Sequence, residues 1–391
     1  MVSFFGTMIT AVAVPYQVFQ LTHSSLAVGL IGLFELATIL GFAFLGGAIA
    51  DANDRRRMVL LTEAGMAMAS VLLIANALLP HPQLWVIYGL AMAVGALDAI
   101  QRPSLDAMLP RLVERDELTA AGAISALRTN VGMIVGPALA GVLIALVGLP
   151  LTYAVDVVTF LFSLVCLGLM NAVPPAIDAG RVSLRGIVEG LRYAASRQEL
   201  VGTYVVDMVA MFFGMPNALF PAIAASHGGP AVLGLLFTAP AVGSGIAFAT
   251  SGWASHVHRH GRAVIVAALL WGVAITAFGL AENLVLVLLF LAAAGAADGI
   301  SGVFRSTIWN QTIPDRLRGR LAGIEMVSYT SGPLLGNAES GLVAQLFSVR
   351  VSIVSGGLLC VAGCLLMAAL LPRFRAYDSR DGVRTAPADG I

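Results

Sequence analysis

Four carboxylic acids interrupt long apolar stretches of this sequence: Glu35, Asp98, Asp207 and Asp298. A charged side chain inside such a stretch is costly unless it is paired or hydrated, so each acid is a candidate for function. Because desolvation disfavours the charged form of a carboxyl group, such an acid can exchange protons within the range of cellular pH. We predict proton exchange at Glu35 and Asp207, which have no arginine within one helical turn.

Hydroxyl groups accompany both of these acids. Thr38 lies on the predicted helical face of Glu35, and Thr203 and Tyr204 lie one turn before Asp207. A hydroxyl group both donates and accepts hydrogen bonds, so it can support either protonation state of a carboxyl group. The alternative for each acid is a structural role, in which it satisfies a buried backbone or polar group.

Arginines inside apolar stretches are the possible partners of these acids. Asp98 has Arg102 one turn away, so an ion pair within one helix is the alternative to a functional role. Arg128 and Arg305 are candidates either for a binding cavity or for neutralising the carboxylates.

Other polar and flexible side chains suggest weaker hypotheses. A stripe that includes Met211 and Phe212 offers an adaptable apolar surface suited to varied ligands, but it could equally face lipid or another helix. Asp156, Glu325 and Glu339 lie nearer the ends of apolar stretches, where we expect hydration to suffice.

The elements that hold these residues must lie in a membrane. Of the 391 residues, 58% are hydrophobic and 11% are charged, and the mean hydropathy is +0.90. An average soluble domain has roughly 25% charged residues, so most of this surface must face lipid. We predict an all-α membrane protein.

Twelve apolar runs are long enough to span a bilayer, which requires about 20 residues. They cover residues 2–20, 26–50, 58–79, 84–105, 120–147, 151–172, 200–225, 232–253, 263–280, 284–308, 321–347 and 351–371. A polar stretch with helical spacing of its apolar residues lies between the sixth and seventh runs. The predicted parts are therefore a six-helix bundle (1–172), a cytoplasmic linker with an amphipathic helix (173–199), a second six-helix bundle (200–372) and a tail (373–391).

The arginines fix the predicted orientation. All 22 basic residues are arginines, and only Arg350 falls in a loop that follows an odd-numbered helix. Positive residues concentrate on the cytoplasmic side of a membrane protein. The loops that follow even-numbered helices and the C-terminus are therefore expected in the cytoplasm, with membrane lipids as partners. The first helix begins without a basic leader, so we interpret it as a span with a truncated tail rather than as a signal peptide.

The two halves of the sequence repeat each other. The residues Ala93, Gly95, Ala96, Asp98 and Ile100 recur as Ala293, Gly295, Ala296, Asp298 and Ile300. The offset spans six helices, so both halves keep the same orientation, as in a six-plus-six transporter with its site between the halves.

Several classes of function are excluded by what the sequence lacks. The net charge is zero without a dense basic tract, so nucleic acid is not an expected partner. There is no phosphate-binding Gly-rich loop, and no catalytic cluster at a plausible site, so the chain is not expected to be an enzyme. The cysteines lie inside apolar runs, and we expect no metal site and no cofactor.

A motif after the second helix resembles the signature of the major facilitator superfamily. Gly47, Asp51, Arg55 and Arg56 match the pattern Gly-x-Leu-Ala-Asp-Arg-x-Gly-Arg-Arg/Lys, with Asp54 in place of its second glycine. We expect Gly47 to let two helices approach, Asp51 to face the N-terminal end of a neighbouring helix, and the arginines to bind anionic headgroups.

A second motif resembles an element associated with exporters of this superfamily. It comprises Gly132, Gly136, Pro137 and Gly141 in the fifth helix. Glycines four residues apart form a face that permits close packing, and the proline removes a backbone hydrogen bond. Generic helix packing is the alternative interpretation.

Longer segments resemble the enterobactin exporter branch of bacterial efflux permeases. They are residues 14–25, 219–222 and 313–321. The resemblance implies the two-bundle fold, with Asp98, Asp207 and Asp298 facing a central cavity, and proton-driven export of a small organic molecule by a monomer in the plasma membrane. The substrate is siderophore-like or drug-like; a non-transporting sensor or scaffold and an uptake permease remain alternatives.

Overall fold

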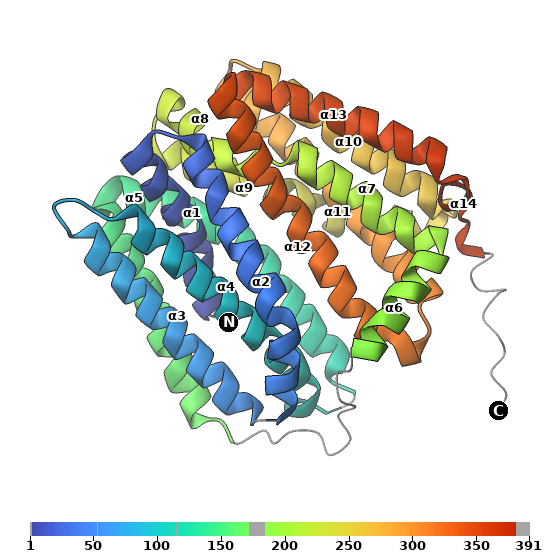
Figure 1. The fold of residues 1–391 in the computed structure, drawn as a ribbon, viewed down its shortest axis with the longest axis horizontal. Helices are drawn as coiled ribbons and strands as arrows, with labels where there is room; N and C mark the ends of the chain where they lie inside the picture. Colours follow the sequence, from blue (N-terminus) through green and yellow to red (C-terminus); the bar gives the residue numbers. More distant parts are fainter. Residues whose placement is uncertain (1, 53, 115, 172–183, 381–391) are drawn as a thin grey trace. The chain divides into compact units, whose positions relative to one another are not determined.

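The structure is a computed structural model that describes residues 2–52, 54–114, 116–171 and 184–380. The side chains of 43–52, 106–107, 109–112, 184–188, 315–316, 318–320 and 322 are outside the described part. Throughout the described ranges the regular structure is helical and no β-strand occurs (Figure 1). The predicted all-α class is confirmed.

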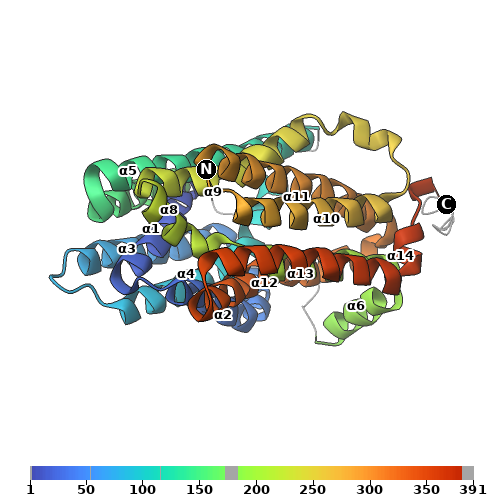
Figure 2. The same ribbon diagram turned by 90° about the horizontal axis from the view of Figure 1, so that it is seen from above.

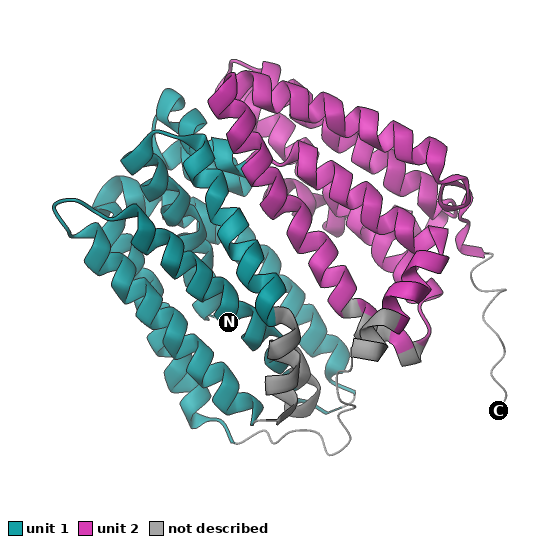
Figure 3. Cartoon of the chain, viewed as in Figure 1, with its two compact units in different colours: residues 1–182, 217–238 teal, residues 183–216, 239–391 magenta. Residues whose placement is uncertain are grey.

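The chain forms two compact units, coloured separately in Figure 3. Unit 1 comprises Met1–Val182 and Asn217–Thr238, and unit 2 comprises Ser183–Pro216 and Ala239–Ile391. Residues 217–238, which we predicted in the second bundle, pack with the first half of the chain and belong to unit 1.

Unit 1 contains the helices of the first half of the chain, the end of the seventh predicted helix and the start of the eighth. Its elements are α1 (Val2–Thr22), α2 (Ser25–Ala52), α3 (Arg55–Ala77), α4 (Leu84–Leu112), α5 (Leu118–Leu169), η1 (Asn217–Leu219), α8 (Phe220–His227) and the start of α9 (Pro230–Ala249). Within it α1 packs against α5, α2 against α4, and α3 against both α4 and α5.

Unit 2 contains the remaining helices. Its elements are α6 (Leu184–Ser196), α7 (Gln198–Gly214), the rest of α9, η2 (Ser251–His256), α10 (His260–Leu280), α11 (Leu284–Thr312), α12 (Asp315–Leu346), α13 (Val349–Leu370) and α14 (Pro372–Ala376). Here α10 packs against α11 and α13 (Figure 2). Helix α7 packs against α12 and α13 (Figure 1). The helix α6 falls within the predicted linker.

Polar residues cap the N-terminal ends of two helices, α11 and α13. The side chain of Asn283 accepts a hydrogen bond from the Val285 backbone and caps α11, and Ser348 does the same for α13 through Val351. Such side chains satisfy backbone N–H groups that have no partner inside the helix.

Ten helical segments in the described residues are long and apolar enough to cross a membrane. One of them, α5, contains two of the predicted helices, which Gly148 separates with φ 76° and ψ 177°. A residue other than glycine would be strained at this positive φ. With α5 divided there and α12 included, the described segments account for the twelve predicted helices.

The predicted span over 200–225 lies within one segment, Gln198–His227, that is long and apolar enough to cross a membrane, but its helix is interrupted. Helix α7 ends at Gly214, and Met215 has extended backbone angles, φ −95° and ψ 106°. The reason is local, because Pro216 follows, and a residue that precedes proline is sterically disfavoured in the helical region.

The C-terminal segment is anchored on unit 2. Phe374 of α14 is completely buried, and a side chain at Gly202 of α7 or Gly261 of α10 would collide with it. The backbone of Arg373 also donates a hydrogen bond to Gln198. These contacts fix the first turns of α7 and α10.

Candidate functional site

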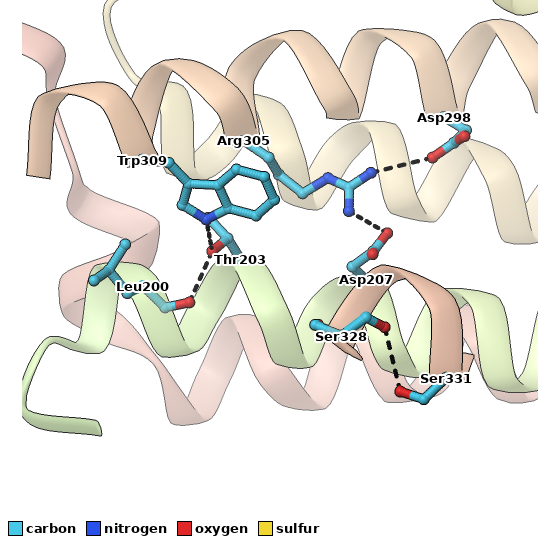
Figure 4. A network of polar contacts seen from close by, with 8 residues as sticks. All are labelled: Leu200, Thr203, Asp207, Asp298, Arg305, Trp309, Ser328 and Ser331. Carbon is cyan, nitrogen blue, oxygen red and sulfur yellow. Dashed lines mark hydrogen bonds and ion pairs between the residues drawn. The ribbon is translucent and has the colours of Figure 1, made fainter. Parts of the chain in front are cut away.

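Arg305 is the centre of a polar network in unit 2 (Figure 4). It projects from α11, and its Nη1 atom lies 2.5 Å from Oδ1 of Asp207 on α7. Its Nη2 atom lies 3.3 Å from Oδ1 of Asp298, two turns earlier in α11. The guanidinium therefore links α7 to α11 and brings together three residues that the sequence marked as candidates.

The network is buried at one end and open at the other. The side chains of Arg305 and Asp207 are 10% and 7% exposed, whereas that of Asp298 is 40% exposed. A charged side chain is tolerated in a buried place only when it is paired with an opposite charge. Arg305 and Asp207 thus depend on each other, and Asp298 connects the pair to the accessible face of α11.

A third acid belongs to the same network. Glu325 of α12 is half-buried and lies within electrostatic range of Arg305. If all three acids were ionised beside this one arginine, two negative charges would be left uncompensated. Sequence reasoning missed Glu325 as a member of the network, because only the packing of α12 against α7 brings it near.

The hydroxyl groups near Asp207 have other roles than the predicted one. The Thr203 hydroxyl donates to the carbonyl oxygen of Leu200 at 2.7 Å and accepts from Nε1 of Trp309 at 2.8 Å (Figure 4). The ring of Tyr204 lies 5.7 Å from that of Trp309, and its hydroxyl has no hydrogen-bond partner among the described residues. The partner of Asp207 is an arginine from another helix, which the spacing along α7 could not reveal.

In unit 1, Asp98 forms the ion pair that was the alternative to a functional role. Its Oδ2 atom lies 3.5 Å from Nε of Arg102, within α4, and the two side chains are 43% and 45% exposed. The repeated aspartates Asp98 and Asp298 thus each contact an arginine of their own helix. Asp298 shares its arginine with the buried acid Asp207.

Glu35 lies partly buried on α2, where the backbone of the helix packs against Gly95 of α4. The Thr38 hydroxyl donates to the backbone oxygens of Phe34 and Glu35 and not to the carboxyl group of Glu35. Asp98 is a source of negative potential at Glu35. The two acids of this region therefore repel each other.

Arg128 and the methionine stripe are engaged in packing. The guanidinium of Arg128 stacks over the ring of Phe4, 5.4 Å from its centre, and pairs with no acid among the described residues. Met211 is buried, and its backbone faces Gly336 of α12 so closely that a side chain there would collide. Phe212 packs edge-to-face on Phe213. Helix contact is thus the structural role of Met211.

The superfamily motif is only partly visible. Gly47 and Asp51 lie among the residues whose side chains are outside the described part. Arg55 and Arg56 are described, and Arg55 is buried in the first turn of α3. Burial does not fit the expected contact of Arg55 with a lipid headgroup.

Arg56 caps the C-terminal end of α5. Its Nε and Nη2 atoms donate to the carbonyl oxygens of Leu167 and Gly168, at 2.7 and 2.5 Å. These carbonyls lie in the last turn of α5, where a positive charge is favourable. Asp54, which replaces the motif's second glycine, caps α3 through the backbone of Arg57.

The glycines of the α5 motif allow helices to touch. A Cβ atom at Gly132 would lie 2.6 Å from the ring of Phe4, and one at Gly136 would lie 2.5 Å from Cβ of Met8. Both contacts are with α1.

The third glycine of the motif meets a different helix. A Cβ atom at Gly141 would lie 2.9 Å from the Cα atom of Gly234 in α9, and one at Gly234 would lie 2.7 Å from the carbonyl oxygen of Pro137. The close approach that this spacing predicts is present within unit 1.

Sequence reasoning also missed a buried acid in unit 1. Asp156 of α5 is 1% exposed, although its position near the end of an apolar run predicted hydration. Thr10 and Ser70 donate hydrogen bonds to it. The hydroxyl-bearing residues of α1 and α3 are visible in the sequence. Their contact with Asp156 could be predicted only if the packing of α1 and α3 against α5 were known.

Solved structures with a similar fold are membrane transporters. A crystal structure of the nucleoside transporter NupG has a TM-score of 0.71 and 12% identity, covering 96% of both chains. A bacterial homologue of the iron transporter ferroportin has a TM-score of 0.68 and 15% identity, again covering 96% of both. At these identities the likeness shows the fold alone, which is that of the major facilitator superfamily.

The sequence assigns the chain within that class. Residues 1–388 match the family described as transmembrane secretion effector, and the chain belongs to this family of major facilitator efflux permeases. The enterobactin exporter EntS of Citrobacter koseri is 32% identical over 369 residues, which is 93% of this chain and 88% of that protein. EntS of Escherichia coli O1:K1 is 30% identical with the same coverage. The chain is a multi-pass membrane transporter of the efflux type and not an enzyme.

Proposed function

We propose that this protein is a secondary active exporter that moves a small organic molecule out of the cell by alternating access, in exchange for protons. The observation that carries the proposal is the network of three acids around Arg305 in unit 2. A set of ionised groups with more negative than positive charge is costly in a poorly hydrated place. Binding of a proton to one of the acids relieves that cost.

Asp207 is the member of the network whose protonation has a mechanical consequence. Its link to Arg305 joins α7 to α11, whereas the link between Asp298 and Arg305 lies within α11. A guanidinium only donates hydrogen bonds, so it holds an ionised carboxylate more strongly than a neutral acid. Protonation of Asp207 therefore loosens α7 from α11, while Asp298 keeps Arg305 paired.

Glu35 is the proposed proton-coupling residue of unit 1. It is partly buried and lies under the influence of the acid Asp98, without an ion pair of its own among the described residues. Repulsion between two carboxylates favours a proton on one of them. In this scheme Asp98 and Arg102 line the water-accessible side, and Glu35 takes up the proton.

The substrate that we propose is an organic molecule of the siderophore type. The support comes from the relatives, which are named as exporters of enterobactin. The rings of Tyr204 and Trp309, which lie beside the network, provide a flat apolar surface in the same unit. A lipophilic, positively charged drug-like molecule is the second candidate, because the acids of the network outnumber its arginine.

The proposed setting is the inner membrane, with the arginine-rich loops and the C-terminus in the cytoplasm and the chain acting as a monomer. The support is the distribution of arginines along the sequence. In the same scheme Gly47 and Asp51 control the conformational change, and the α5 glycines favour export; both assignments rest on the resemblance of their motifs.

Flux into proteoliposomes with an imposed pH gradient tests the proposal. The purified full chain should accumulate enterobactin or a lipophilic cation only when the gradient is present. Asp207→Asn keeps the size of the side chain but removes its titration, and it should reduce gradient-driven flux at least tenfold. Glu282→Gln is the matched control, because Glu282 pairs with Arg350 in an exposed place and should leave flux unchanged.

Each alternative function has its own outcome in this assay. Absence of any flux of either substrate would support a sensor or scaffold. Flux that follows the gradient in the opposite sense would support an uptake permease. Uphill flux that is equally fast in Asp207→Asn and in the unmodified chain would remove Asp207 from the coupling mechanism.

A further inference from the structure

Unit 1 holds a buried acid that the Arg305 network does not use. The carboxyl group of Asp156 lies on α5 where this helix meets α1 and α3. The hydroxyl oxygens of Thr10 and Ser70 both lie 2.7 Å from its Oδ2 atom. Its Oδ1 atom has no hydrogen-bond partner among the described residues and faces Gly6, at which any side chain would collide with it.

The hydrogen bonds around this carboxyl group can be satisfied with or without its proton. Ser70 has one hydroxyl proton but two acceptors in reach, Oδ2 of Asp156 at 2.7 Å and the carbonyl oxygen of Met66 at 3.2 Å. When Asp156 is ionised, Ser70 and Thr10 both donate to Oδ2. When Asp156 is protonated, it donates to the Ser70 oxygen, and Ser70 turns its own proton to Met66.

The charged groups of the surrounding helices do not pair with Asp156. Helix α1 contains no charged residue, and the acid of α3 on this side is Glu63, which accepts a hydrogen bond from Ser3. On α5 the nearest titratable group is Tyr153, one turn away, whose hydroxyl donates to Gln17 at 2.7 Å. Among the described residues no arginine or histidine forms an ion pair with Asp156, so a negative charge there has only neutral partners.

Three residues with hydroxyl groups share one face of α1. Ser3, Thr7 and Thr10 are spaced by four and three residues and so lie on one side of the helix. Ser3 contacts the buried acid Glu63, and Thr10 contacts Asp156. Thr10 is itself partly exposed, which places a hydroxyl group between the buried carboxyl and the accessible side of α1.

We propose that Asp156 is a second proton-binding site of this protein, located in unit 1 and served by the hydroxyls of Thr10 and Ser70. Its proton exchanges without the loss of an ion pair, in contrast to that of Asp207. Because Asp156 holds α1 through Thr10 and α3 through Ser70, its protonation changes the hydrogen bonds that join three helices. Only its use in transport rests on the proposed antiport function.

Infrared spectroscopy of the purified full chain in lipid nanodiscs tests the proposal directly. A protonated carboxylic acid has a C=O stretch that a carboxylate lacks. We expect a component of this band that is lost in Asp156→Asn and that weakens as the pH is raised, because the carboxylate replaces the protonated acid. Tyr153→Phe is the matched control, because it removes a buried hydrogen bond one turn away on the same helix and should keep the band.

Two further variants keep the test decisive if Asp156→Asn does not fold. Thr10→Val and Ser70→Ala each remove one hydroxyl, and each should change the proton affinity reported by the band by about tenfold, or about one pH unit. The proposal is overturned if no band component depends on Asp156 or on these hydroxyls. It is also overturned if that component is constant over the whole pH range.

The two proposals can fail separately. If the Asp156 band titrates but proteoliposome flux does not depend on the pH gradient, the antiport function fails and the proton site stands. If Asp207→Asn uncouples flux while the Asp156 band does not titrate, the antiport function stands and the proton site fails.

Discussion

The two units hold a buried acid in different ways. In unit 2, Asp207 faces a guanidinium, whose hydrogen-bonding groups are all donors. In unit 1, Asp156 faces two hydroxyls, each of which can donate or accept. A guanidinium stabilises one charge state of its partner, whereas hydroxyls accommodate both. Protonation should therefore separate helices in unit 2 and only redirect hydrogen bonds in unit 1.

Removal of the guanidinium should have the largest effect on stability. Arg305→Ala leaves Asp207 buried without its cation, and breaking a buried pair from one side costs about 3 to 5 kcal/mol. The free energy of unfolding of the purified chain in detergent, measured by denaturant titration at neutral pH, should fall by that amount.

A double variant distinguishes loss of pairing from loss of volume. In Arg305→Gln combined with Asp207→Asn, neither side of the buried pair carries a charge, and Asp298, which also loses its cation, is 40% exposed. This variant should recover more than half of the stability lost in Arg305→Ala. If the double variant is as unstable as Arg305→Ala, the effect of Arg305 on stability does not come from its charge, and the proposed electrostatic difference between units 1 and 2 is wrong.

The fold was largely predictable because the bilayer restricts it. Runs of apolar residues identify spanning helices, and Gly148 divides α5 between two predicted runs. The end of α7 before Met215 was missed although Pro216 signals it, because the apolar run continues across the proline. Hydropathy reports where a chain is buried in lipid and not where its backbone bends.

The candidate site was predictable by residue type and not by pairing. The cost of a charge in an apolar stretch marked Asp207, Asp298 and Arg305 individually. Their contact requires α7 to lie against α11, and one sequence contains no direct record of that packing. The same limit applies to Asp156, whose partners come from two other helices. Spacing along one helix found only the pair of Asp98 with Arg102.

The acid of unit 1 should cost less to remove. Asp156→Ala leaves the hydroxyl of Thr10 without its acceptor, and it leaves Ser70 only the longer bond to Met66. Leaving a buried polar group unsatisfied costs about 1 to 3 kcal/mol, so we expect a loss in that range. Asp156→Asn keeps an acceptor oxygen and should lose less. Denaturant titration of both variants beside Arg305→Ala compares the units directly, and an equal cost for Asp156→Ala and Arg305→Ala would contradict the distinction.

The arrangement in unit 1 also depends on the close approach of α1 to α5. Gly136→Ala places a methyl group against Met8, and such overpacking costs about 1 to 3 kcal/mol. By moving α1 away it should also weaken the contact of Thr10 with Asp156 and shift the Asp156 infrared band. Gly122→Ala is the control on the same helix, because its new methyl group meets open space. It should be neutral or stabilising by up to about 1 kcal/mol, and a similar loss in both variants would rule out packing as the cause.

The smallest effect is expected at Asp98, the sequence counterpart of Asp298. Its pair with Arg102 is nearly half exposed and lies within one helix, with the acid on the N-terminal side. Pairs of this kind contribute about 0.3 to 0.5 kcal/mol, and salt screens them. Asp98→Asn should therefore lower the free energy of unfolding by no more than this amount at low ionic strength, and the difference should vanish at about 1 M salt. A buried pair is screened much less, so the cost of Arg305→Ala should persist under the same conditions. A large loss of unfolding free energy in Asp98→Asn that does not depend on salt would show that the repeated aspartates Asp98 and Asp298 share one electrostatic role. The electrostatic difference between the units would then consist of Asp207 alone.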